Sequence, residues 1–568
     1  MSDIADIADI ELLLCHADDQ RPVLEEGLPL ESAADEPQPG GEELIHDFAD
    51  FSDDPNDLSL QRWSVIAPEG PAGDALLALL EPLIRKREQD QGAPVVPYRV
   101  PAGMDADAAI RWSKSVYHDE SIALEDLPRY LLVLGDLDEV SLELQQAMAS
   151  EALVGRLVSR SAAGYAAYVD KLLSSERAPS REARARALFF TAQDGTAATT
   201  IGHRALVAPS VARCRDTRQR GGFKARDIEE IGYDGPEAAR SALLEQLGRP
   251  EPSMLFTMSH GLGAPRRGWS SADEQRAVQG AMSLGSGVRI AAEDLGDRPF
   301  LPGGIWFFLA CYGGGTPAES AYHHWLARLR DAGGFGGRVD GVLAGLPRPG
   351  DRPFIAALPQ AALASPRGPL AVMAHIDLAW TYSFQDMGPD GKDRASRFEG
   401  VFSSLVKGAR VGNSYNELLR YLGNANHELA AMYNQESRAE TAGKPLAPDQ
   451  GRAKRRANLW MLREDLAGYV LLGDPAARLA IDRDRGAVKA TPAPAEVRSP
   501  VPPLPAALPA PAARARDAAR MQRAVHEKIL GEEGDRKIAE RYGIMREELQ
   551  RWYDAYCEAG LEALGELP

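Results

Sequence analysis

A histidine and a cysteine that could form a catalytic pair each follow a short apolar run. His260 comes two residues after the run Met254–Met258, and Cys311 comes directly after the run Ile305–Ala310. A thiolate is a strong nucleophile, and an imidazole beside it can take its proton and later protonate a leaving amine. The two residue types therefore indicate acyl transfer from a peptide bond, with His260 and Cys311 as the catalytic residues. The structural alternative is a core cysteine and an unrelated loop histidine.

Glycines stand beside both candidate residues. Gly261 follows His260, and Gly313–Gly315 come shortly after Cys311. Because these positions have no Cβ, a bound peptide can approach the backbone closely. We expect the amides of Gly261 and Cys311 to form an oxyanion hole, in which one donor typically contributes about 2.7–4 kcal/mol to the transition state.

The two apolar runs must position the pair. Each run is short and continuous and is bounded by glycine or proline, a pattern typical of buried strands in a parallel sheet. The carboxyl ends of parallel strands meet at one edge, which is where open α/β sheets bind ligands. The pattern predicts an α/β fold in which His260 and Cys311 share that edge.

The sequences around the pair resemble those of the caspase-like cysteine peptidases (clan CD), the group that includes gingipains and CHAT-domain proteases. The segment LFTMSHGLG contains His260, the segment IWFFLACYGGGT contains Cys311, and both are similar to the His-Gly and Ala-Cys blocks of that group. Leu471–Leu479 resembles the Gly-Asp-Pro block that closes gingipain-like catalytic domains. Cys311 follows His260 by 51 positions, close to the caspase separation. Leu309 stands before Ala310 where caspases have glutamine, so cleavage after Asp is not implied.

The resemblance covers about residues 60–485 and implies a cysteine endopeptidase that acts on protein substrates and needs no cofactor. It also implies a fold: a caspase/gingipain-like, mostly parallel sheet flanked by helices and preceded by a second α/β subdomain. Relatives inside bacterial cells act in regulated proteolysis or antiviral defence, so these are the roles that the resemblance leads us to expect.

The resemblance also suggests where specificity lies. In this superfamily, loops at the sheet edge build the pocket for the residue before the scissile bond, and an acid there selects Arg or Lys. Asp377, directly after the apolar run Leu370–Ile376, is the first candidate, and Asp340 is the second. Trp380 is a candidate for an apolar wall of the same pocket. The alternatives are a turn-capping role for each acid and a core position for Trp380.

The order of predicted elements divides the chain into six segments. They are an acidic disordered tail (1–58), an N-terminal α/β subdomain (59–180), a caspase-like catalytic subdomain (181–390), a helical closing segment (391–485), a Pro/Ala-rich linker (486–512) and a helical module (513–568). Strand-like runs alternate with amphipathic helical stretches in both α/β segments, which indicates βαβ units. Besides the two runs above, we expect strands of the catalytic sheet at Ala187–Ala192, Ile201–Val207, Gly341–Ala344 and Leu370–Ile376.

The net charge of −19 is concentrated near the start of the chain. Residues 1–60 contain 18 acidic residues and one arginine, which leaves the other 508 residues near −2. The body is therefore almost neutral and has no electrostatic footprint for nucleic acid. The acidic segment has few aromatic residues, which predicts a disordered tail.

The cysteine and histidine pattern gives no sign of a metal site or a disulfide framework. The cysteines are scattered, without a CxxC motif: Cys15, Cys214, Cys311 and Cys557. This usage suits a reducing compartment. The adjacent His323–His324 point in different directions on a helix, so we expect no metal. The first residues lack the basic region of a signal peptide, and no apolar run is long enough to span a membrane, so we expect a cytoplasmic chain with no membrane partner.

The last segment contains a helix-turn-helix-like pattern. Residues 491–512 hold eight prolines and six alanines, which is typical of a semi-rigid linker. Beyond them, Ala539, Gly543 and Leu549 match the spacing of a helix-turn-helix. Yet residues 513–568 hold ten basic and twelve acidic residues, and Glu547–Glu548 would repel phosphate. The charge favours a small module that binds a protein partner over one that binds DNA.

Two other functional classes stay open. One is a catalytically inactive scaffold of the same fold. The other is a DNA-binding regulator that acts through the helix-turn-helix-like module.

Overall fold

The computed structural model describes residues 9–24, 26–29, 32, 54–119, 122–178, 182–333, 338–348, 350–384, 395–444, 446–447, 449–482 and 549. The chain divides into two units, Met1–Val488 and Lys489–Pro568. Apart from Leu549, the second unit lies outside the described residues, and so do the predicted linker 486–512 and helical module 513–568. The first unit is therefore the one described below.

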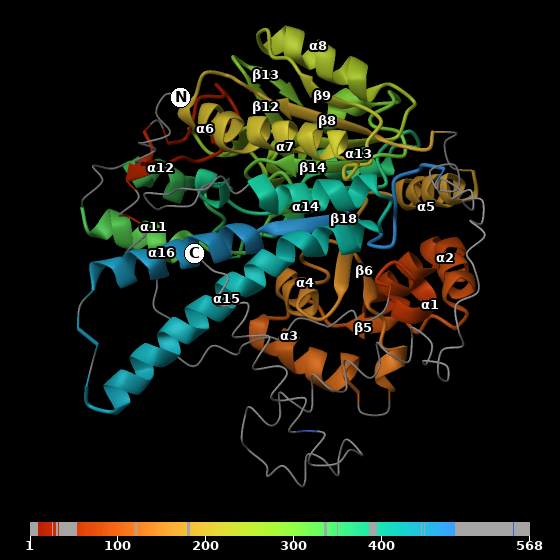
Figure 1. Ribbon diagram of the computed structural model, residues 1–568, viewed down its shortest axis with the longest axis horizontal. Helices are drawn as coiled ribbons and strands as arrows, with labels where there is room; N and C mark the ends of the chain where they lie inside the picture. Colours follow the sequence, from red (N-terminus) through yellow and green to blue (C-terminus); the bar gives the residue numbers. More distant parts are fainter. Residues whose placement is uncertain are drawn as a thin grey trace, which may run out of the picture. The chain divides into compact units, whose positions relative to one another are not determined.

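One ten-stranded sheet runs through the first unit (Figure 1). Its strands, in spatial order, are β5 Tyr98–Val100, β4 Trp63–Pro68, β6 Tyr130–Leu134, β7 Leu153–Leu157, β18 Tyr469–Gly473, β17 Ala371–His375, β14 Ile305–Leu309, β10 Ser253–Met258, β8 Arg186–Thr191 and β9 Ile228–Ile231. Every neighbouring pair is parallel except β17 and β18. The sheet thus has two parallel halves of opposite direction, joined at the antiparallel pair β17–β18.

Helices and short strands surround this sheet. The helices of the described residues are α1 Leu58–Gln61, α2 Pro71–Gln91, α3 Ala106–Trp112, α4 Leu142–Ala149, α5 Ala162–Arg177, α6 Ala197–Gly202, α7 Ala208–Gln219, α8 Pro236–Leu247, α9 Ala272–Val278, α10 Ala292–Leu295, α11 His323–Asp331, α12 Arg338–Gly345, α13 Ala357–Ala364, α14 Ala395–Val406, α15 Val411–Thr441 and α16 Gln450–Ala467. Among these helices, none is long and apolar enough to cross a membrane. The observed mixed α/β fold, a large and mostly parallel sheet flanked by helices, agrees with the fold class expected from the sequence.

The strands that carry the catalytic candidates are buried on both faces, as their continuous apolar runs predict. On one face, Phe256 of β10 and Phe307 of β14 pack against Phe398 and Phe402 of α14 at ring-centroid distances of 5.2–6.2 Å. On the opposite face, the rings of Trp306 and Phe308, two residues apart in β14, stack at a centroid distance of 4.8 Å. This aromatic packing on both faces fixes the sheet edge from which His260 and Cys311 emerge.

The acidic segment at the start of the chain is not wholly disordered, and for residues 9–24 and 26–29 that expectation was wrong. They form β1 Asp9–Ile10, β2 Leu14–His16 and β3 Leu28–Pro29. β2 joins a four-stranded sheet with β11 Gly261–Gly263, β12 Met282–Gly285 and β13 Val288–Ile290. The physical reason is the apolar run within the acidic composition, because Ile10, Leu12, Leu13 and Leu14 are all at most 2% exposed.

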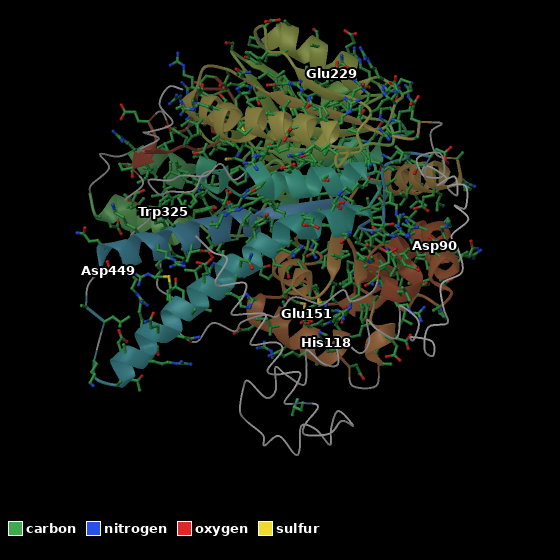
Figure 2. The ribbon with its side chains drawn as sticks, viewed as in Figure 1. Asp90, His118, Glu151, Glu229, Trp325 and Asp449 are labelled. Atoms are coloured by element: carbon green, nitrogen blue, oxygen red, sulfur yellow. The ribbon has the colours of Figure 1, made fainter. Side chains whose placement is uncertain are left out.

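The same segment reaches the helices beside the large sheet. The indole N–H of Trp325, a residue of α11 (Figure 2), donates to the backbone carbonyl of Ser32 at 2.8 Å. Arg338 of α12 donates to the carbonyl of Gly27 at 3.3 Å and forms an ion pair with Glu26. These contacts anchor the segment to the same unit as the sheet.

Two predicted strands are helical. Gly341–Ala344 lies within α12, and Ile201–Val207 lies within α6 and the π-helical turn His203–Val207 that follows it. Val339 and Val342 of α12 and Leu346 directly after it are buried and recur at intervals of three and four. A four-residue apolar run conceals this helical period. Three strands of the large sheet were not predicted: β7, β9 and β18, the last of which lies in the segment 391–485 that was expected to be helical.

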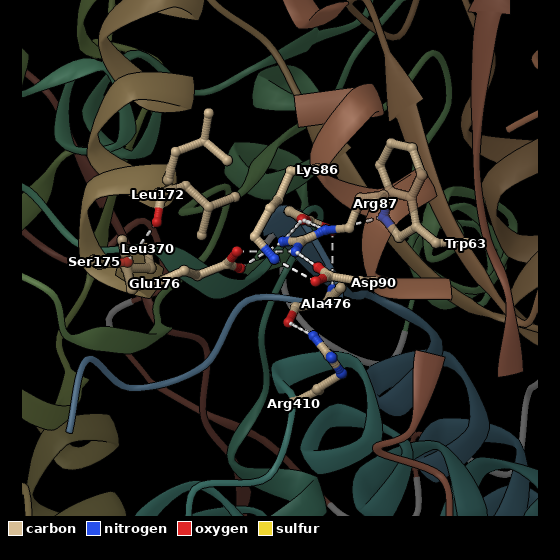
Figure 3. Close-up of polar contacts among 12 residues, drawn as sticks. Trp63, Lys86, Arg87, Asp90, Leu172, Ser175, Glu176, Leu370, Arg410 and Ala476 are labelled. Atoms are coloured by element: carbon tan, nitrogen blue, oxygen red, sulfur yellow. Dashed lines mark hydrogen bonds and ion pairs between the residues drawn. The ribbon is translucent and has the colours of Figure 1, made fainter. Parts of the chain in front are cut away.

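The Gly-Asp-Pro block ties β18 to the other elements of its own half of the sheet. Asp474, directly after β18, accepts hydrogen bonds from Trp63 of β4 at 2.9 Å and from Arg87 of α2 at 2.7 and 3.1 Å. Arg87 also binds Glu176 of α5 and Asp90 (Figure 3). Asp474 and Arg87 are fully buried, so the block joins its strand to the first half of the sheet through a desolvated charge network.

Candidate active site

The two catalytic candidates lie at one edge of the sheet. β10 and β14 are adjacent and parallel, and Met258 is in register with Leu309. His260 and Cys311 each stand two residues beyond these positions, and the amide of Ser259 donates to the carbonyl of Leu309 at 3.1 Å. The structure thus brings the two residues together at the carboxyl ends of neighbouring strands.

The amides of Gly261 and Cys311 converge on a single carbonyl oxygen. The N–H of Gly261 donates to the carbonyl of Leu13 at 2.9 Å, and the N–H of Cys311 donates to the same oxygen at 3.3 Å. A Cβ built on Gly261 would lie 1.8 Å from the carbonyl oxygen of Cys311, so only glycine permits this approach. Two backbone donors aimed at one carbonyl oxygen form the geometry of an oxyanion hole.

The chain turns sharply after the cysteine. Tyr312 has a φ of 56°, in the left-handed region that a bulky side chain rarely adopts. A backbone hydrogen bond maintains this conformation, because the N–H of Tyr312 donates to the carbonyl of Asp377 at 3.0 Å. Strained residues of this kind cluster at functional sites, where the surrounding structure holds them in place.

His260 is oriented by an acid and two hydroxyl groups that sequence reasoning missed. Nε2 of His260 lies 2.9 Å from the hydroxyl oxygen of Thr196 and 3.8 Å from Oδ2 of Asp194. The hydroxyl groups of Thr196 and Thr199 both donate to Oδ1 of Asp194 at 2.8 Å. A signal was present in the sequence, since Asp194 follows β8, the neighbour of β10, at the same sheet edge.

This network sets the tautomer of the ring. Because the hydroxyl of Thr196 donates to Asp194, its oxygen accepts the proton of His260 Nε2. Nδ1 then carries the lone pair, and it is buried without a hydrogen-bond partner among the described residues. Burial lowers the pKa of His260, and the nearby charge of Asp194 opposes that shift. The resting ring is therefore a neutral base with Nδ1 free to accept a proton.

The thiol of Cys311 is protonated at rest. Its sulfur accepts the N–H of Ala379 at 3.1 Å and lies 3.5 Å from the carbonyl of the same residue. Burial raises the pKa of Cys311 well above its ordinary value, and the hydrogen bond from Ala379 acts in the opposite direction. The thiol is hydrogen-bonded to Ala379 and Nδ1 of His260 has no partner, so among the described residues no hydrogen bond joins the two side chains. General-base activation of the nucleophile requires Nδ1 and the thiol to meet.

The two acids expected to select Arg or Lys do not present a free carboxylate to this site. Asp377 is buried, and its carboxylate accepts hydrogen bonds from the hydroxyl of Ser320 at 2.8 Å and from the amides of Ala321 and Leu378 at 2.9 and 2.7 Å. Asp340 is an exposed residue of α12 and does not follow a strand.

Trp380 lies in the core beside the site. Its ring packs against Tyr322 and Trp325 at centroid distances of 5.9 and 5.4 Å. Its backbone pairs with Leu12 in an antiparallel bridge, so Trp380 contacts the segment around Leu12 through its main chain.

One group of metal-binding residue types occurs in the described part of the chain. Glu319, His323 and His324 have ligand atoms within 4.8 Å of one another, and all three side chains are exposed. They lie on α11 and the loop before it, and no contact links them to His260 or Cys311 among the described residues. The expectation of a metal-free chain stays a prediction.

No protein-family model matches the chain, and a comparison with curated proteins finds no match. Among solved structures, one described as "Structure of Protease" has a TM-score of 0.41 at 11% identity and covers 73% of this chain and 78% of its own. The complex of Porphyromonas gingivalis RgpB pro- and mature domains has a TM-score of 0.40 at 12% identity, with coverages of 74% and 79%. The Arg-specific cysteine proteinase gingipain R has a TM-score of 0.37 at 12% identity, with coverages of 74% and 78%. No residue role follows from likenesses at this level.

Proposed function

We propose that the protein is a cysteine endopeptidase in which Cys311 is the nucleophile and His260 is the general base and acid. One observation carries the proposal: the amides of Gly261 and Cys311 hold one peptide carbonyl oxygen between them, at 2.9 and 3.3 Å. A carbonyl held in this way is polarised for attack by the thiol of the same cysteine.

The proposed cycle uses groups that the chain itself supplies. Nδ1 of His260 takes the thiol proton as the sulfur of Cys311 attacks the carbonyl carbon, and the negative oxygen is held by the two amides. Collapse breaks the C–N bond, and the imidazolium gives its proton to the leaving amine. Water then adds to the thioester with His260 as base, which releases the carboxylate and restores the thiol. Asp194, through Thr196, stabilises the imidazolium that forms in both halves of the cycle.

The direct test is a peptide-library cleavage screen with the full chain. Wild type is compared with Cys311→Ala and His260→Ala, and products are identified by mass spectrometry. The matched control is Cys214→Ala, since Cys214 is an equally buried cysteine on α7. We expect cleavage by wild type and Cys214→Ala and none by the other two. Equal cleavage by Cys311→Ala would refute the assignment, and no cleavage by wild type would leave the inactive-scaffold alternative.

A further inference from the structure

A segment of the chain itself lies against the residues of the candidate site, in the manner of a bound peptide. The backbone of Glu11 donates to the hydroxyl of Thr381 at 3.2 Å and accepts from the amide of Thr381 at 3.1 Å. Two residues later, the amide of Leu13 donates to the carbonyl of Ala379 at 3.1 Å. Glu11–Leu13 is thus an added antiparallel strand on the segment that follows β17, the mode in which many proteins bind extended peptides.

The added strand places one particular peptide bond at the catalytic residues. The carbonyl of Leu13 is the one that the amides of Gly261 and Cys311 hold. Beyond it, Leu14–His16 pairs in parallel with β11, so that Leu14 faces Gly261. The bond between Leu13 and Leu14 therefore stands where the proposed cycle would break a substrate bond.

The side chain before that bond is apolar and wholly enclosed. Leu13 is 0% exposed and belongs to the same buried hydrophobic cluster as Leu12 and Trp380. Asp377 was the first acid expected to bind an Arg or Lys side chain. Its carboxylate already accepts three hydrogen bonds from within the protein. A cationic side chain in place of Leu13 would lose its hydration without gaining that carboxylate.

We propose that the candidate site selects an extended peptide with leucine immediately before the cleaved bond, and that Glu11–Cys15 is the chain's own resident strand at that site. This inference rests on the proposed peptidase function and names its substrate class. The strand is anchored on both sides of the bond: Ile10 pairs with Leu28, and the carbonyl of Leu14 accepts from Val23 at 3.0 Å. Because it is tethered, the resident strand competes with outside peptides at an effective concentration that typically reaches about millimolar.

The test uses the full-length chain and synthetic peptides that copy its residues 9–17. The parent peptide is Asp-Ile-Glu-Leu-Leu-Leu-Ser-His-Ala, with serine in place of the cysteine, and two others carry Arg or Asp at the position of Leu13. Mass spectrometry identifies the bond that is cut. Wild type, Leu13→Asp and Cys311→Ala are compared, and Leu60→Asp is the matched control because Leu60 lies on α1 and is 49% exposed.

We expect the parent peptide to be cut after its second leucine at least about tenfold faster than either charged peptide. Leu13→Asp puts a charge into the enclosed position and displaces the resident strand, so this variant should cut the parent peptide at least about tenfold faster than wild type. Leu60→Asp should match wild type.

Each of the other outcomes would refute one named part of the proposal. Faster cutting after Arg or Asp, dependent on Cys311, would refute the leucine specificity and leave the peptidase function standing. Equal rates for folded Leu13→Asp and wild type would refute the resident strand. If Leu13→Asp does not fold, the peptide ranking with wild type still decides the specificity. Cleavage of none of the peptides, nor of any library peptide, would refute the function and the inference together.

Discussion

His260 depends on a neighbour that contacts neither the nucleophile nor a substrate. The hydroxyl oxygen of Thr196 accepts a hydrogen bond from Nε2–H of His260, and the hydroxyl donates a hydrogen bond to Oδ1 of Asp194. Thr196→Val keeps the shape of the side chain and removes the hydroxyl. The ring then loses its fixed tautomer, and because general-base catalysis typically contributes 10²–10⁴-fold, we expect kcat to fall by about 10²-fold.

The conservative variant separates orientation from packing. Thr196→Ser keeps the hydroxyl and should retain most of the activity, while KM should change little in either variant. A rise in KM with unchanged kcat, or equal losses in the valine and serine variants, would contradict the role assigned to the hydroxyl.

The protonation states of the pair predict a pH dependence. Burial lowers the pKa of His260 below its ordinary value of 6.5, so the base stays neutral at a pH where a solvent-exposed histidine is protonated. The acidic limb of the pH–rate profile should therefore fall below that value. Stability follows the same sign: the unfolded chain binds this proton at a higher pH than the folded chain, so stability is lost as the pH falls from the unfolded to the folded pKa. An acidic limb at or above the ordinary histidine value would contradict a buried neutral base.

At the residue scale the sequence pointed to the proposed catalytic pair and its two amides but not to their surroundings. His260, Gly261 and Cys311 could be found because each stands directly after an apolar run. Asp194 and Leu13 could not, because their contacts with these residues depend on which strands become neighbours. The interpretation of Asp377 shows the same limit, since a strand-end position says nothing about the hydrogen bonds that its carboxylate already makes.

The close approach of β11 to the end of β14 is the feature that places the two amides on one carbonyl oxygen. At Gly261 a Cβ would stand 1.8 Å from the carbonyl oxygen of Cys311 and 3.1 Å from its nitrogen. Gly261→Ala must therefore separate the two strands and misplace both amides. We expect a loss of activity of about 10²–10³-fold, the range for one missing donor, together with a lower Tm.

Gly232→Ala is the matched control, because a Cβ there meets nothing within 4 Å. Its activity and Tm should stay near those of wild type. Wild-type activity in Gly261→Ala would mean that the two amides do not act together on the substrate carbonyl.

Among the elements, long or strongly apolar ones were predictable and short ones were not. The runs at β10, β14 and β17 are mostly apolar and became central strands. Gly341–Ala344 is too short to show a helical period of apolar residues by itself. It lies in α12, where the buried neighbours Val339 and Leu346 extend one apolar face of the helix.

On the scale of the whole unit, Asp474 holds β18, the strand at the junction of the two half-sheets, to β4 and α2. Asp474→Ala leaves Arg87 fully buried with Glu176 and Asp90 as its remaining partners. Breaking a buried pair in this way typically costs about 3–5 kcal/mol of unfolding free energy, and the two remaining acids place the expected loss near the lower end.

Urea unfolding measures the loss, with Glu81→Ala as the control. Glu81 forms an exposed ion pair with Arg85, and such pairs contribute at most about 1 kcal/mol. A loss of unfolding free energy in Asp474→Ala no larger than in the control would show that this buried charge network does not stabilise the unit.

The start of the chain shows why composition alone misjudged part of the molecule. Its strong negative charge predicts disorder, yet the apolar residues Ile10 and Leu12–Leu14 are buried in the unit. Their docking requires an edge built from segments near residues 261, 311 and 379, and the separation of these segments along the chain hides that edge from local patterns.

The covalent intermediate is the most direct test of the account. The full chain and its Leu13→Asp variant are mixed with the parent leucine peptide, quenched in acid during the first turnover, and mapped by mass spectrometry. We predict an acyl group from the amino-terminal half of the peptide, in thioester linkage to Cys311 and absent from Cys311→Ala. Cleavage of the peptide without an adduct on Cys311, or an adduct on another residue, would contradict it.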